Sequence, residues 1–158
     1  MTGLDLRQAL SDDTVAALRK LSVDHIVVCF PGQDLDPEQQ MAFCVRFGVL
    51  DDHRARSHFN RPDFPAVSLV TNKPVMIGSK RLGVIKADAW HSDMSFSNRP
   101  ATASFLLGKQ IPTIGGDTMF ANMALAYEAL SPSMKNFIAA LEGVRDVTLS
   151  PNYPRQAP

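Results

Sequence analysis

The chain has 158 residues and carries 16 basic and 16 acidic side chains, so its formal net charge is zero. This length predicts a single domain over residues 1–158 that can bury a core, and the balanced, scattered charge predicts no nucleic-acid partner and no membrane partner. No apolar run approaches the roughly 20 residues that span a bilayer, and the first residues show no secretory signal, so we expect a cytoplasmic protein.

The first predicted elements are a capped helix and a short buried strand. Ser11 can cap a helix over residues 12–21, because apolar side chains recur there with helical spacing. These side chains are Val15, Leu18 and Leu21. The run 25–30 is apolar and rich in β-branched residues, and Pro31 and Gly32 end it, so this run predicts a strand.

A second helix is predicted by its capping residues. Asp36 can cap it, Pro37 suits the first helical position, and Gln39 stands where a capping box needs it. Gly48 is expected to end this helix. Its apolar side is expected to hold Met41, Cys44 and Val45. Neither of the two cysteines fits a metal-binding spacing, so we expect both to be reduced packing residues.

The segments after residue 50 predict a series of strands and two further helices. Strands are expected over residues 66–71, 90–96, 102–108, 117–121 and 144–149, with strand fragments and loops between 72 and 89. Asn122 can cap a helix through Leu130, and Ser131 can cap another through Leu141. Several strands separated by turn residues favour an antiparallel β core over an alternating strand–helix sheet.

The stretch Trp90–Phe96 carries a His-x-Asp pair. Side chains of a strand alternate between its two faces, so His91 and Asp93 would project to the same side. An imidazole and a carboxylate are two of the three ligands of the 2-His-1-carboxylate facial triad, which holds iron(II) and leaves positions open for oxygen chemistry. Because such a pair also occurs in surface turns without a metal, the motif alone leaves both interpretations open.

Three segments in a fixed order give this pair its context. They are WHSDMSF at 90–96, GGDTMFANM at 115–123 and AYEALS at 126–131. Together they resemble the taurine dioxygenase-like (TauD/TfdA) family of iron(II)/2-oxoglutarate-dependent dioxygenases. The resemblance implies a double-stranded β-helix (jelly roll), mainly β with flanking helices, which would be incomplete in this chain. It also implies hydroxylation of a small, acidic organic substrate with release of succinate and CO2.

The resemblance also assigns cofactor roles to individual residues. His91 and Asp93 would be the catalytic iron(II) ligands, and the hydroxyl of Thr118 would donate a hydrogen bond to a carboxylate of the co-substrate 2-oxoglutarate. A strand threonine chosen for its β propensity is the alternative at Thr118. A carboxylate at Asp93 favours hydroxylation, because related halogenases have a small residue there.

Three further residues are candidates for contact with the substrate. His53 follows a segment after which a histidine touches substrate in some family members, and a solvated loop histidine is the alternative. Met94 and Phe96 flank the metal pair and could line the pocket, and core packing is the alternative for both.

The family's remaining iron ligand and its 2-oxoglutarate anchor have no counterpart in this chain. No histidine follows His91, whereas the resemblance implies a second histidine and an arginine far downstream. We therefore expect residues 1–158 to be the N-terminal part of a dioxygenase domain, with open strand edges covered by further chain or within a homo-oligomer.

One alternative is a catalytically inactive jelly-roll fragment that acts as a binding or oligomerisation module. Another is a metal-binding jelly roll of the cupin type, which would not need Thr118.

Overall fold

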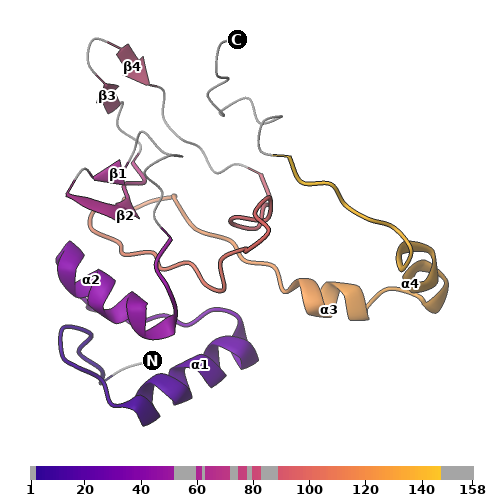
Figure 1. Cartoon of the computed structure of the whole chain (residues 1–158), viewed down its shortest axis with the longest axis horizontal. Coiled ribbons are helices and arrows are strands. Elements are labelled where there is room, and N and C mark those ends of the chain that lie inside the picture. Colours follow the sequence, from indigo (N-terminus) through magenta and orange to yellow (C-terminus); the bar gives the residue numbers. More distant parts are fainter. Residues whose placement is uncertain are drawn as a thin grey trace. The chain divides into compact units, whose positions relative to one another are not determined.

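The computed structural model describes residues 3–51, 60–61, 63–71, 75–77, 80–82 and 89–146, and Figure 1 labels their helices and strands. The chain divides into two compact units. The first holds Met1–His91 together with Thr102–Lys109, and the second holds Ser92–Ala101 together with Gln110–Pro158. The buried core and the described strands belong to the first unit.

Helix α1 spans Asp12–His25 and begins at its expected cap. The Ser11 hydroxyl accepts a hydrogen bond from the Thr14 N–H (3.2 Å), which satisfies one of the backbone donors that a helix start leaves open. The expected apolar stripe faces the core, because Val15 is 6% and Leu18 is 1% exposed. The first predicted helix is therefore confirmed.

The strand predicted over residues 25–30 is wrong. His25 is still the last residue of α1, and residues 27–30 form no strand. The helix ends at Ile26, whose backbone has a positive φ of 65° and whose N–H donates to the Ser22 carbonyl (2.9 Å). A strand needs the backbone groups of a neighbouring strand, and none pairs with this segment among the described residues. A helix finds its hydrogen bonds within its own segment.

Helix α2 spans Pro37–Cys44 and carries the predicted capping box. The Asp36 carboxylate accepts a hydrogen bond from the Gln39 N–H (2.8 Å), and the Gln39 side-chain oxygen accepts one from the Asp36 N–H (3.0 Å). A 3-10 turn, η1 (Val45–Phe47), follows the helix, and Gly48 ends it as expected. The second predicted helix and its start are therefore confirmed, whereas the α-helix ends at Cys44 and only the following 3-10 turn reaches Gly48.

The core of the first unit is built on α1 and α2. Its buried members are Leu6, Leu18, Leu35, Phe43 and Cys44. Phe105 packs edge-on against Phe43 with ring centroids 5.6 Å apart, so a segment far along the chain joins this core. The expected burial of Val45 is wrong, because this residue begins the tighter 3-10 turn, which shifts the phase of the side chains, and it is 54% exposed.

The described residues contain two separate antiparallel strand pairs. β1 (Asn60–Arg61) pairs with β2 (Phe64–Ser68), and β3 (Val75–Ile77) pairs with β4 (Lys80–Leu82). β2 overlaps the strand predicted over residues 66–71 and contacts α2. The second pair confirms the strand fragments expected between residues 72 and 89.

The second unit contributes two short helices, α3 (Met123–Glu128) and α4 (Pro132–Ile138). Both begin where the sequence predicts, since the Asn122 side chain accepts from the Leu125 N–H (3.0 Å) and the Ser131 hydroxyl accepts from the Met134 N–H (3.2 Å). Each helix ends two or more residues before its predicted end. No described residue of this unit is buried. Of the helices that the structure describes, none has the length and apolar character to cross a bilayer.

The strands predicted over residues 90–96, 102–108 and 117–121 are wrong, because these described segments contain none. The strand predicted over 144–149 is described only over 144–146, which are not in a strand either. Extended backbone becomes a strand only when a partner takes up its hydrogen bonds, and in the described part of the chain these segments have none. The described residues are more helical than β, so the mainly β jelly roll is not confirmed by them.

Candidate functional site

The predicted metal-ligand pair lies at a turn and not in a strand. Asp93–Phe96 form the turn, and the Ser97 N–H donates to the Met94 carbonyl (2.9 Å). The argument that strand alternation places His91 and Asp93 on one face therefore does not apply. Their common role as ligands stays a prediction that rests on the resemblance.

His91 is exposed, and one nitrogen of its ring lies within hydrogen-bond distance of a backbone carbonyl. The Nδ1 atom lies 2.9 Å from the Ala89 carbonyl oxygen, and because a carbonyl only accepts hydrogen bonds, Nδ1 carries the proton. In the neutral ring, Nε2 then bears the lone pair that can bind a metal ion. Histidines that ligate metals almost always donate their other ring N–H in this way, so the tautomer of His91 suits a ligand.

Asp93 is exposed, and the two apolar candidates that follow it, Met94 and Phe96, are half-buried. Partial burial is compatible both with lining a pocket and with packing, so the substrate role of these two residues stays a prediction. One imidazole nitrogen and one carboxylate oxygen are ligand types that non-haem iron(II) takes, so the donor set of His91 and Asp93 fits that ion.

Gly115 and Gly116 make the turn that the sequence predicts. Their φ angles are 73° and 78°, which glycine adopts readily because it lacks a Cβ. A Cβ on Gly116 would also lie 3.0 Å from the Pro112 Cγ. Thr118 follows in an exposed segment without regular secondary structure. Its hydroxyl is accessible to a ligand, and its role with 2-oxoglutarate stays a prediction.

The structure does not assemble a complete metal site from the residues it describes. Among them, no group of three or more His, Cys, Asp or Glu side chains is arranged to hold a metal ion. His53 lies outside the described residues, so its predicted contact with substrate also stays a prediction.

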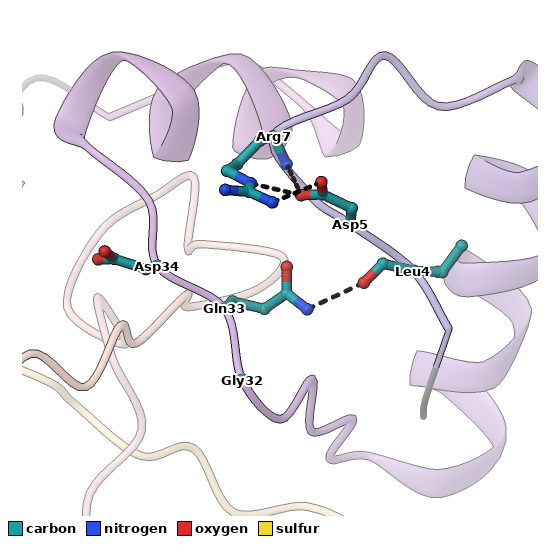
Figure 2. Close-up of a pocket in the computed structure, with 6 residues that line it drawn as sticks. All are labelled: Leu4, Asp5, Arg7, Gly32, Gln33 and Asp34. Carbon is teal, nitrogen blue, oxygen red and sulfur yellow. Dashed lines mark hydrogen bonds and ion pairs between the residues drawn. The ribbon is translucent and has the colours of Figure 1, made fainter.

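The first unit contains a pocket of about 200 Å³ that none of the predicted site residues lines (Figure 2). Its lining residues are Leu4, Asp5, Arg7, Gly32, Gln33 and Asp34. Figure 2 shows the Arg7 guanidinium against the Asp5 carboxylate. The Arg7 Nε donates to Asp5 Oδ1 (2.8 Å), and the Arg7 Nη2 donates to Asp5 Oδ2 (2.9 Å). This hydrogen-bonded pair lowers the pKa of Asp5 to about 2, so both charges of the pair are already compensated.

The polar groups of this pocket bind two parts of the chain to each other. The Gln33 side chain donates to the Leu4 carbonyl (2.9 Å) and accepts from the Leu6 N–H (3.0 Å). Lys109 lowers the pKa of Asp34 through a hydrogen bond to its carboxylate. We interpret these polar groups as structural, because they hydrogen-bond the N-terminal segment to the loop before α2. Sequence reasoning missed these residues because their partners lie 27 or more positions away in the chain.

Comparison with known proteins identifies the family. The chain matches the family described as taurine catabolism dioxygenase TauD, TfdA family over residues 2–156. It therefore belongs to that family, and the resemblance drawn from the three sequence segments is confirmed.

Curated relatives show what kinds of protein the chain is similar to. The alpha-ketoglutarate-dependent 2,4-dichlorophenoxyacetate dioxygenase of Cupriavidus pinatubonensis is 33% identical over 150 residues, which cover 90% of this chain and 51% of the relative. The alkylsulfatase of Acinetobacter baylyi is 30% identical over 157 residues, which cover 99% of this chain and 46% of the relative. The chain thus spans about half the length of the curated relatives it matches.

A solved structure extends the similarity to three dimensions. The crystal structure of AAD-2 in complex with Mn(II) and N-oxalylglycine matches with a TM-score of 0.64 and 29% sequence identity. The match covers 88% of this chain and 49% of the AAD-2 chain. The sequence comparison and the structural comparison thus both relate the chain to dioxygenases. In each comparison the chain covers about half of the matched protein.

Proposed function

We propose that residues 1–158 are the N-terminal part of a single non-haem Fe(II)/2-oxoglutarate-dependent dioxygenase domain. One family covers residues 2–156, and its curated relatives include enzymes named as alpha-ketoglutarate-dependent dioxygenases. The match to AAD-2 supports the jelly-roll fold for the whole domain. The structural observation that carries the proposal is the 2.9 Å contact between the His91 Nδ1 and the Ala89 carbonyl oxygen, because a proton on Nδ1 leaves the lone pair of the neutral ring on Nε2.

His91 and Asp93 are the residues of this chain that would hold iron(II). The metal ion with 2-oxoglutarate would supply the oxidising chemistry that hydroxylates a C–H bond and releases succinate and CO2. The chain's own contribution is to present one imidazole nitrogen and one carboxylate oxygen and to leave metal positions open. A third ligand, a second histidine, would come from outside residues 1–158, as no histidine follows His91.

Thr118 is the residue that would bind 2-oxoglutarate. N-Oxalylglycine in the AAD-2 structure is an analogue of 2-oxoglutarate, which supports a binding site for that co-substrate in the family. A hydroxyl that donates to a carboxylate forms a charge-assisted hydrogen bond, and Thr118 is an exposed residue.

The proposed substrate is a small organic acid. The relatives are named for 2,4-dichlorophenoxyacetate, phenoxypropionate and sulfate esters. Each of these compounds carries an anionic group on an organic molecule. The anionic group differs among these compounds, so the proposal is limited to their shared chemistry. We further propose that the protein acts as a homo-oligomer.

The test uses the protein expressed at its natural length and measures 2-oxoglutarate-dependent succinate formation with iron(II). His91→Ala and Asp93→Ala should each abolish it, because each removes a metal ligand. His25→Ala is the matched control: this exposed histidine ends α1 and should tolerate replacement with activity retained. Full activity in either ligand variant would contradict the metal assignment.

The same assay tests the role of Thr118. Thr118→Val should weaken the apparent affinity for 2-oxoglutarate roughly ten- to a hundredfold, since a hydrogen bond to a charged group contributes about 1.5–3 kcal/mol. The affinity for the organic substrate should change less. An unchanged affinity for 2-oxoglutarate would remove Thr118 from the site. Absence of iron-dependent turnover in the unaltered protein would favour the inactive binding module.

A further inference from the structure

We draw no further inference here: the strongest candidate, the exposed apolar surface patch on α3 and α4 of the second unit with Met123, Leu125 and Phe137, carries nothing, because nothing in the part of the chain that the structure describes shows what covers it.

Discussion

The two cysteines of the chain lie in different surroundings. Cys44 is 9% exposed and belongs to the core, whereas Cys29 is exposed, and no disulfide joins them. Burial raises the pKa of the Cys44 thiol from 9.0 to about 11, because the charged thiolate loses its hydration in the core. The packing role expected from the sequence is therefore confirmed for Cys44, and the expected burial of Cys29 is wrong.

This shift predicts how stability depends on pH. The pKa of Cys44 is higher in the folded than in the unfolded chain, so the neutral thiol stabilises the fold at low pH. That contribution is complete below about 9 and is lost as the pH rises from 9 towards 11. Urea unfolding of the natural-length protein should therefore show a steeper loss of stability over this range than Cys44→Ala shows. Identical slopes in the two proteins would contradict the burial of Cys44.

Thiol labelling provides a second check on the same residue. In a Cys29→Ala variant, Cys44 is the remaining cysteine of residues 1–158. At about pH 8 it should react with a disulfide reagent at least about tenfold more slowly in the folded protein than in urea, because the thiolate is the reactive species. Fast labelling in the folded state would show that Cys44 is accessible.

At the scale of the elements, local hydrogen bonds decide where the helices begin. Each of the four described α-helices starts at a side-chain cap, namely Ser11, Asp36, Asn122 and Ser131. Every one of these caps accepts from a backbone N–H three residues ahead. Bonds of such short range can be recognised in the sequence, and for this reason the helix starts were predicted correctly.

The capping box of α2 predicts a measurable contribution to stability. Asp36→Ala should lower the free energy of unfolding by about 1 kcal/mol, because it leaves the Gln39 N–H without its acceptor. Asp36→Asn keeps a side-chain oxygen and should change the stability by much less. Urea titration of the two variants gives the comparison. Equal losses would show that the charge of Asp36, and not its role as an acceptor, stabilises the helix.

At the scale of the whole molecule, the described apolar surface of the second unit is not covered. Large side chains are widely exposed there, including Met119 (73%), Met123 (71%), Leu125 (66%) and Phe137 (67%). Helices of six and seven residues such as α3 and α4 are not stable alone in water, and an apolar surface of this kind favours association.

We therefore expect residues 1–158, expressed alone, to self-associate and to form no succinate with iron(II) and 2-oxoglutarate. Light scattering after size-exclusion chromatography gives the oligomeric state. Replacement of Leu125 and Phe137 by Glu should reduce the association, because charges on exposed positions disfavour contact between apolar faces. A folded monomer of residues 1–158 that produces succinate would show that two protein ligands are sufficient, and the triad-based proposal would be wrong.

The sequence by itself determined the family, the four helix starts and the Gly115–Gly116 turn. The helix starts and the turn depend on residues that lie within a few positions of each other, and the family depends on three short segments in a fixed order. The tertiary structure decided what depends on distant or non-local partners. Among the described residues no strand pairs with residues 90–96, and the side chain of Phe105 packs against Phe43. A strand is stabilised by hydrogen bonds from another part of the chain, so its formation cannot be deduced from the alternation of its own side chains.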